Sequence, residues 1–276
     1  MSKRFEESKT TFREAITGTD DNVDLFGAAM VISSMGFSDT EPSIYLKELE
    51  QFSDSVESQM HSEMSARKIV SLVNTELFEN QGFRGNKNDY YNPDNSYLSR
   101  VFDLRLGIPI TLSVIYMEVA QRIGLECDGI GFPAHFLIRC GGEKSELYVD
   151  VFNEGKLMSR QDLFLRLKEQ GFLGDSGESF IAAVTRRQIL QRMLTNLRIA
   201  LRRINDFERW LPVTELQLIL EPWNSALFLE RGMVHFTNRE FKNSLEDLQR
   251  YIEIEPDNSN EDVVRIIEVL KKYQDD

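Results

Sequence analysis

A histidine and an aspartate lie on either side of a predicted hairpin, where they could form part of a catalytic site. His135 falls in the strand-like segment PAHFLIRC and Asp150 in a second one, ELYVDVF, with the turn-like GGEKSE between them. If the hairpin turns about residues 142 and 143, His135 pairs directly with Asp150. An imidazole held by a carboxylate normally activates a nucleophile. The pair therefore predicts either a binding or catalytic dyad or a hydrogen bond that fastens the hairpin.

The same register predicts a polar and an apolar face for the hairpin. His135 and Asp150 share the polar face with Leu137, Arg139 and Tyr148. The apolar face carries Phe136, Ile138, Cys140, Leu147, Val149 and Val151. Arg139 is therefore a candidate binding residue beside the pair.

No cysteine is placed where this pair could use its thiol. The chain contains only Cys127 and Cys140, and the second alternates onto the face opposite His135. Nothing in their spacing predicts a disulfide framework, and we expect both to be small apolar residues. Thr111 and Ser113 remain as substitute nucleophiles, although hydroxyls in a first helical turn commonly bind local backbone groups.

The elements that must position these residues are mostly helical. Apolar residues at three- and four-residue spacing predict helices between residues 5 and 85. The segment LGIPITLSVIYMEVAQRIGLE predicts a buried helix with Pro109 in its first turn. The hairpin follows, and the pattern is helical again from about residue 160. Together these elements predict an α+β fold.

A turn-rich stretch over residues 84–95 precedes the buried helix. Its polar and aromatic side chains suit the rim of a cleft leading to His135, but they also suit a compact hydrogen-bonded loop. The residues concerned are Arg84, Gly85, Asn86, Asp89, Tyr90, Tyr91, Asn92 and Asn95.

The stretch NDYYNPDNSYLSRVFDLRLGIPITLSVIYMEVAQRIGLECDGIGFPAHFLIRC resembles the SirB-type transglutaminase-like family. The resemblance implies a transglutaminase-like (cysteine-proteinase-like) core with a Cys-His-Asp triad, in which His135 and Asp150 match two members. The family's Gly-x-Cys falls on Gly107-Ile108-Pro109, so Pro109 occupies the nucleophile position. Proline brings no nucleophile and removes a backbone N–H from the helix N-terminus, where a thiolate would be stabilised.

The C-terminal part contains a repeat. Glu221-Pro222 recurs as Glu255-Pro256, an offset of 34 residues, which is the period of a tetratricopeptide helix pair. We predict a helical N-terminal layer and transglutaminase-like domain over residues 1–180, and tetratricopeptide-like helices over residues 181–276. Because so short an array is not independent, we expect this tail to pack on the first domain.

Charge narrows the range of partners. Lys and Arg number 32 against 45 Asp and Glu, and the net charge of -13 predicts no binding to nucleic acid. Residues 179–205 nevertheless contain no acid, so their arginines could face an acidic partner peptide or acidic parts of the same molecule. These arginines are Arg186, Arg187, Arg192, Arg198, Arg202 and Arg203.

Composition also argues against a cofactor, a metal site and a membrane segment. The three histidines, His61, His135 and His235, have no ligand spacing. The longest apolar run, residues 108–120, is shorter than the roughly 20 residues that cross a bilayer. The polar N-terminus does not resemble a signal peptide, and we expect a cytoplasmic protein without membrane insertion. The sequence does not specify an oligomeric state.

The leading functional hypothesis is a pseudoenzyme, a non-catalytic protein-binding or regulatory scaffold on a degenerate transglutaminase-like fold. The alternative is an amide hydrolase or acyl transferase that acts on protein through His135, Asp150 and a hydroxyl nucleophile. A purely structural assembly subunit is a third possibility. The candidate binding residues are Tyr90, Tyr91, Asn92, Asn95, His135, Arg139, Asp150, Arg198, Arg202 and Arg203.

Overall fold

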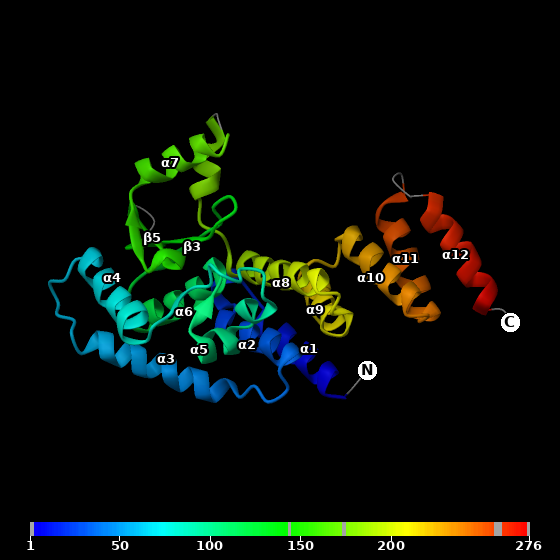
Figure 1. Ribbon diagram of the computed structural model, residues 1–276, viewed down its shortest axis with the longest axis horizontal. Helices are drawn as coiled ribbons and strands as arrows, with labels where there is room; N and C mark the ends of the chain where they lie inside the picture. The colour runs from blue at the N-terminus through cyan, green and yellow to red at the C-terminus, as the bar shows by residue number, and fades with distance from the viewer. Residues whose placement is uncertain (1–2, 143–144, 173–174, 257–260, 275–276) are drawn as a thin grey trace. The chain divides into compact units, whose positions relative to one another are not determined.

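The computed structural model describes residues 3–142, 145–172, 175–256 and 261–274 (Figure 1). The chain divides into two compact units, residues 1–200 and residues 201–276. The sequence-based boundary after residue 180 stays a prediction. The first unit mixes helices with a small sheet and is therefore α+β, as expected.

The helical layer of the first unit follows the predicted apolar spacing. It comprises α1 (Lys3–Ala15), α2 (Leu25–Gly36), α3 (Pro42–Glu57), α4 (Ala66–Asn74) and α5 (Leu98–Leu104). The Asp24 carboxylate caps α2 by accepting the Gly27 N–H at 2.8 Å, which satisfies an otherwise unpaired donor. A π-helical turn, η2 (Thr75–Asn80), continues α4.

The buried central helix is α6 (Pro109–Arg122), and Pro109 is its first residue as predicted. Almost every side chain on α6 is buried, because helices pack on one side of it and strands on the other. Figure 1 shows α6 between α3 and the sheet. The helix can be apolar on nearly every side because only its last turns, with Met117, Gln121 and Arg122, reach solvent.

The sheet has four antiparallel strands in the order β3-β4-β5-β6 within the described residues. They are β3 (Cys127–Ile130), β4 (Leu137–Cys140), β5 (Leu147–Asp150) and β6 (Lys156–Met158). The predicted hairpin is confirmed as β4 and β5. Its register differs from the predicted one, because Ile138 pairs with Val149 rather than with Leu147. A shift of two residues keeps each side chain on the predicted face.

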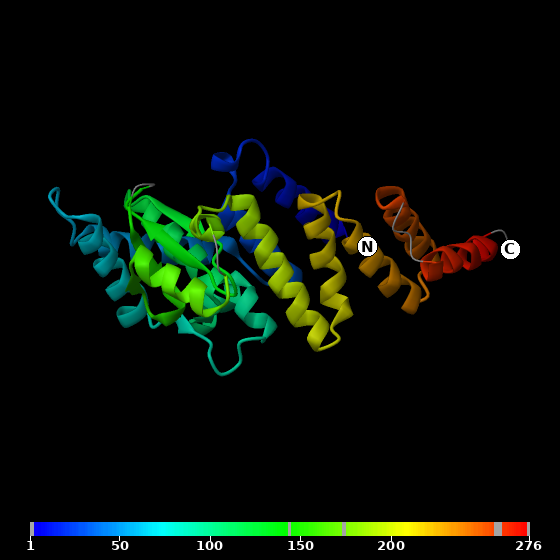
Figure 2. The same ribbon diagram turned by 90° about the horizontal axis from the view of Figure 1, so that it is seen from above.

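The prediction of a polar face is wrong, because both faces of the sheet are covered. Leu137 and Tyr148 are 0% and 3% exposed and pack against Leu163 and Leu167 of α7 (Arg160–Glu169). In Figure 1 α7 lies on the side of the sheet away from α6, and Figure 2 shows it against the strands from above. Hydrophobic residues of α7 thus bury the face of the hairpin that was predicted to be polar.

The prediction for the cysteines is also wrong. Cys127 of β3 lies opposite Cys140 of β4, and the two form a disulfide with their Cα atoms 4.3 Å apart. The partner strand β3 contains Asp128 and Gly129, residue types that strands disfavour. The sequence therefore did not predict β3, and without that strand the two cysteines had no reason to meet.

Two short parallel strands tie the turn-rich loop to the start of α6. Arg84 and Gly85 form β1, which pairs with Leu106 and Gly107 of β2. A Cβ atom on Gly85 would lie 2.5 Å from the ring of Phe152. Only glycine allows this approach of the loop to the residues that follow β5.

The first unit also contains most of α8 (Arg186–Arg203). The Asp20 carboxylate accepts hydrogen bonds from the backbone N–H groups of Arg186 and Arg187, at 2.8 and 3.1 Å, and so caps the helix. Their guanidinium groups donate to the carbonyls of Val23 and Gly18, each at 2.8 Å. These two arginines therefore serve the molecule's own N-terminal segment.

The second unit is helical in its described residues. It contains the end of α8, then α9 (Phe207–Leu220), α10 (Ser225–Thr237), α11 (Phe241–Ile254) and α12 (Glu261–Gln274). A core of Leu245, Leu248, Tyr251, Val263, Ile267 and Leu270 joins α11 to α12. Gly232 allows α10 to approach Leu248, because a Cβ there would lie 2.8 Å from a leucine methyl. No helix in the described part of either unit has the length and apolarity needed to span a bilayer.

Candidate functional site

His135 and Asp150 meet at the edge of the sheet, as the sequence predicts. Nε2 of His135 lies 2.8 Å from Oδ1 of Asp150. The contact does not arise from strand pairing, since His135 precedes β4 and Asp150 is the last residue of β5. The turn that presents the imidazole has Ala134 in the left-handed region, with φ of 52°. What this pair does for the protein stays a prediction.

The Asp150 carboxylate is completely buried and heavily bonded. It accepts hydrogen bonds from the side-chain amide of Asn153 at 2.9 Å and from its backbone N–H at 3.3 Å, and Arg166 lies 3.5 Å away. Burial alone would raise the pKa of Asp150, but His135, Asn153 and Arg166 together lower it below its usual value. An ionised Asp150 accepts the Nε2 proton, so a neutral imidazole carries its acceptor lone pair on Nδ1.

Both substitute nucleophiles form hydrogen bonds with backbone groups. The Thr111 hydroxyl donates to the Asn95 carbonyl at 2.8 Å and receives the Ile108 N–H at 3.2 Å. The Ser113 hydroxyl donates to the Pro109 carbonyl at 2.8 Å. Both side chains are fully buried. The Ser113 bond and the Thr111 bonds to Ile108 are local backbone interactions typical of a first helical turn, whereas the Thr111 bond to Asn95 joins the helix to the loop.

An open pocket of about 490 Å³ lies beside the imidazole. Its aromatic walls are Tyr90, Phe132 and Phe152, and the ring centroid of Phe152 lies 5.8 Å from that of Tyr90 and 6.1 Å from that of His135. Polar and charged groups complete the lining, namely Lys87, Asn153, Arg166, Glu169 and Gln170. Within the described chain, Thr111 and Ser113 are not part of it.

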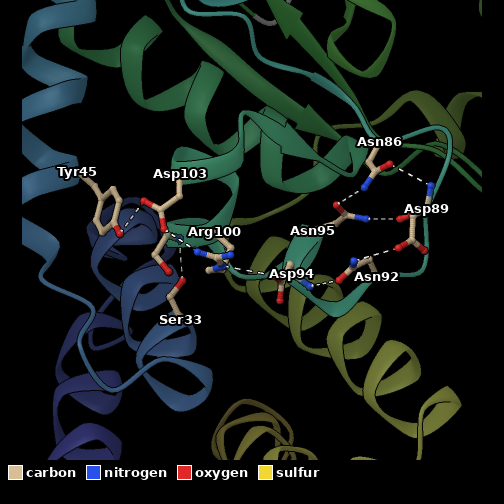
Figure 3. A network of polar contacts seen from close by, with 10 residues as sticks. Ser33, Tyr45, Asn86, Asp89, Asn92, Asp94, Asn95, Arg100 and Asp103 are labelled. Atoms are coloured by element: carbon tan, nitrogen blue, oxygen red, sulfur yellow. Dashed lines mark hydrogen bonds and ion pairs between the residues drawn. The ribbon is translucent and has the colours of Figure 1, made fainter.

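The turn-rich loop divides into a hydrogen-bonded interior and an aromatic exterior. Asn95 is 2% exposed, donates to the carbonyls of Asp89 and Tyr90, and accepts from Asn86 at 3.0 Å. Asn92 donates to the Asp89 carboxylate at 3.0 Å. Figure 3 shows these amides turned toward one another within the loop. These amide side chains hold the loop together through hydrogen bonds within it.

The tyrosines of the loop are placed differently from its amides. Tyr90 and Tyr91 are 37% and 51% exposed, and their rings contact each other edge to face at 5.2 Å. Of the residues predicted for the cleft rim, Arg84, Asp89, Tyr90 and Tyr91 are exposed, and the two tyrosines are the aromatic members. The segment thus has the bonded interior expected of a compact loop, and the binding rim stays a prediction.

A second polar network anchors the far end of the loop to the helical layer. Arg100 lies between Asp94 and Asp103, at 3.5 and 3.1 Å, and Tyr45 of α3 donates to Asp103 at 3.2 Å (Figure 3). Burial, followed by the Asp103 charge, raises the pKa of Tyr45 to about 12. The loop that carries Tyr90 is thus fixed at both of its ends.

The predicted binding arginines do not gather at this pocket. Arg139 pairs with Asp128 across β3 and β4 at 2.6 Å. Arg198 is 8% exposed on α8, Arg202 lies 3.3 Å from Glu230, and Arg203 is exposed in the last turn of the helix. Among the residues that the structure describes, none of these four arginines lines the pocket.

Several residues around the imidazole were not predicted for this site. Arg192 of α8, predicted only as part of the arginine series, donates to the His135 carbonyl at 2.7 Å, and Phe152, Asn153 and Arg166 lie at the pocket. The Asp-x-x-Asn spacing of Asp150 and Asn153 was a usable signal, because such side chains often cap a turn. For Arg166 and Arg192 only the fold brings the residues close. No cluster of potential metal ligands occurs in the described ranges.

A buried helix beneath an antiparallel sheet, with histidine and aspartate in contact at the sheet edge, agrees with the arrangement that the sequence resemblance implies. A model described as "Transglutaminase-like superfamily" matches residues 44–195, more than half of the chain. The class of the protein is thus defined by this core. Both members of the histidine–aspartate pair lie within the matched residues.

Relatives among known proteins narrow the assignment. A UPF0162 protein from Xylella fastidiosa is 30% identical over 255 residues, covering 90% of each chain. A UPF0162 protein from Vibrio cholerae is 27% identical over 180 residues, covering 64% of this chain and 66% of that one. The chain therefore belongs to the transglutaminase-like superfamily and, within it, to the UPF0162 family.

Part of the chain is also similar to part of a longer protein. F-box only protein 21 from Mus musculus is 34% identical over 142 residues, which cover 47% of this chain and 21% of that protein. The likeness therefore extends over about a fifth of the relative's length.

Proposed function

We propose that this protein is a SirB-type pseudoenzyme that binds a protein partner instead of catalysing acyl transfer. One observation carries the proposal: α6 begins with the buried imino acid Pro109, and both nearby hydroxyls donate to backbone carbonyls. An imidazole and carboxylate without a nucleophile have little to activate. Their bonding supports a structural role, in which Asp150 fixes the ring as one wall of a pocket.

The aromatic rim supports binding of a protein. Tyrosine is enriched at the centres of interfaces because its ring supplies contact area and its hydroxyl supplies a hydrogen bond. Tyr90 and Tyr91 are exposed, yet the loop that carries them is internally bonded. A partner would therefore meet a preformed surface and would cost little conformational entropy at this loop.

The helical second unit fits the same proposal. The 34-residue recurrence of Glu-Pro and the successive helices α9 to α12 support tetratricopeptide-like pairing, a form of architecture often used to bind peptides. This step rests on analogy of fold. The cytoplasm is the proposed location of the complex.

The test compares partner capture by variants of the full-length protein. Wild type, Tyr91→Ala and Ile44→Ala are each immobilised on a support and incubated with extract from the source organism. The captured proteins are then quantified by mass spectrometry. Ile44 on α3 is 53% exposed, which matches the 51% of Tyr91. We expect the captured amount of at least one partner to fall about tenfold with Tyr91→Ala, equivalent to about 1.4 kcal/mol of binding free energy. The same partner should be captured by Ile44→Ala as well as by wild type.

The catalytic alternative is tested in parallel. Wild type and His135→Ala are incubated with glutamine-containing peptides, and ammonia release and peptide cleavage are measured. The proposal requires no turnover by either protein. Turnover by wild type that His135→Ala abolishes would instead establish the hydrolase or transferase.

A further inference from the structure

We infer that the pocket beside His135 binds a peptide carboxylate. This inference rests on the proposed function and specifies the chemistry of the partner segment that enters the site. It draws on the charges around the pocket, the hydrogen-bonding groups that line it and the shape of its walls.

Positive charge is concentrated at the pocket although the chain as a whole is acidic. Lys87 is exposed and Arg166 is 35% exposed at the lining, and Arg192 lies just behind the His135 carbonyl. The chain carries a net charge of -13, so this excess is local. A positive site within a negative molecule attracts an anion from close range while the remaining surface repels it.

The field of Arg192 reaches the aromatic wall. Its guanidinium lies over the Phe136 ring at 5.5 Å and donates to the His135 carbonyl. Burial raises the pKa of the Tyr90 hydroxyl, and the Arg192 charge acts on this pKa in the opposite direction. Arg192 therefore contributes positive potential at the pocket from a position that a ligand need not touch.

The balance of charges suits a single negative charge. Three cations, Lys87, Arg166 and Arg192, face two carboxylates, Glu169 and Asp150. Asp150 is buried and accepts from both His135 and Asn153. Counted without the imidazole, the three cations exceed the two carboxylates by one charge. A carboxylate neutralises it, whereas a phosphate dianion would leave an excess of negative charge beside Glu169.

The hydrogen-bonding groups fit a peptide that carries this carboxylate. Arg166, Lys87 and the Gln170 amide offer donors, and Nδ1 of His135 offers an acceptor. No bond to Nδ1 is formed within the part of the chain that the structure describes. A carboxylate would accept from the cationic side, and a neighbouring peptide N–H would donate to Nδ1. The partly exposed ring of Phe152 supplies an apolar wall for the adjoining chain.

The test uses three acetylated six-residue peptides and the full-length, isotope-labelled protein. The first is Gly-Leu-Gly-Glu-Leu-Gly amide, with a side-chain carboxylate. The second replaces Glu by Gln and ends in a free carboxylate, and the third replaces Glu by Gln and ends in an amide. Binding is followed by changes in the NMR signals of the His135 ring and the 84–95 loop, with each peptide raised to millimolar concentration.

We expect one or both carboxylate peptides to bind at least tenfold more tightly than the neutral peptide. The arm that binds identifies the source of the carboxylate, side chain or chain terminus. Lys87→Glu is expected to weaken this binding about tenfold. Lys47→Glu makes the same charge change at an exposed position on α3 and is expected to leave affinity unchanged.

Three results would overturn the inference. These are equal binding of the neutral peptide, absence of binding by all three peptides, and equal effects of Lys87→Glu and Lys47→Glu. Any of them, combined with partner capture that still depends on Tyr91, would refute the carboxylate and leave the proposed function standing. Turnover of amide substrates would refute the proposed function itself.

Discussion

The Asp150 side chain illustrates how a single buried residue can join several groups of a site. Its carboxylate receives the His135 imidazole, both donors of Asn153 and the charge of Arg166. The sequence could supply His135 and Asp150 because residue type and a turn signal suffice to pair them. It could not supply Arg166, because only the packing of α7 on the sheet brings that side chain to the pocket.

Asp150→Asn should lower the free energy of unfolding by about 2 kcal/mol at neutral pH, since a buried charged acceptor is lost. The pKa of Asp150 is lowered in the folded protein from the usual value of 3.8, so its stabilisation is complete above about pH 4. That stabilisation disappears as the pH falls through the folded-state pKa. Urea unfolding at several pH values checks this prediction.

The pH series includes an internal comparison. Wild type should lose stability more steeply below about pH 4 than Asp150→Asn, and the two curves should converge in acid. Parallel curves would show that the carboxylate contributes no pH-dependent stability.

At the level of elements, the short parallel pair β1–β2 places the tyrosine loop over the residues that follow β5. The approach depends on Gly85, since its missing Cβ leaves room for the Phe152 ring. The loop and buried helix could be predicted from turn residues and apolar spacing. Two-residue strands such as β1 have no periodicity to detect, and their pairing follows from the tertiary fold.

Gly85→Ala should disturb both stability and the pocket. The added methyl would lie 2.5 Å from the Phe152 ring and 2.6 Å from its carbonyl oxygen, so Phe152 has to move. We expect a loss of about 1–3 kcal/mol in thermal or urea unfolding, together with weaker binding of the carboxylate peptides. Asn88→Ala, an exposed change in the same loop, serves as the control and should alter neither property.

The hairpin shows how far an alternating pattern can lead. Alternation gave the faces of β4 and β5 correctly, but the register depends on the turn, and Ile138 pairs with Val149 instead of Leu147. Burial of the supposed polar face could not be inferred, because it depends on Leu163 and Leu167 of α7. The sequence thus specified which residues share a face but not what covers it.

The disulfide between β3 and β4 predicts how many free thiols the protein contains. Because Cys127 and Cys140 form a disulfide, protein prepared without reductant should show no reactive thiol on denaturation. Cys140→Ala should expose one thiol, from Cys127, and should lower stability by up to about 3 kcal/mol. Alkylation followed by mass spectrometry counts the thiols, and two alkylated cysteines in unreduced wild type would contradict the pairing.

At the scale of the whole molecule, the chain divides into two compact units, residues 1–200 and residues 201–276. The core of the second unit is made by α11 and α12, with Leu248 fully buried against Gly232 of α10. Charge composition predicted the general avoidance of nucleic acid, but it could not place the local positive site. That site combines residues from the loop, from α7 and from α8, which are far apart in sequence.

Leu248→Ala should destabilise the second unit by about 2–5 kcal/mol, because truncation leaves a cavity in its core. Hydrogen exchange should show lost protection in α10 to α12 and unchanged protection in β3 to β6. Leu165→Ala is the matched control, since Leu165 is 56% exposed on α7. Equal loss of protection in the strands would show that the two units unfold together.

The cap that Asp20 places on α8 has a consequence for synthesis of the chain. Its carboxylate and the Arg186 N–H are separated by 166 positions. At about 5–20 residues per second, a ribosome needs roughly 8–33 s to polymerise that interval. The first helices of the chain therefore leave the ribosome well before α8 is synthesised. Until then the Asp20 carboxylate has no Arg186 N–H to accept, so the N-terminal segment cannot reach its native contacts with α8.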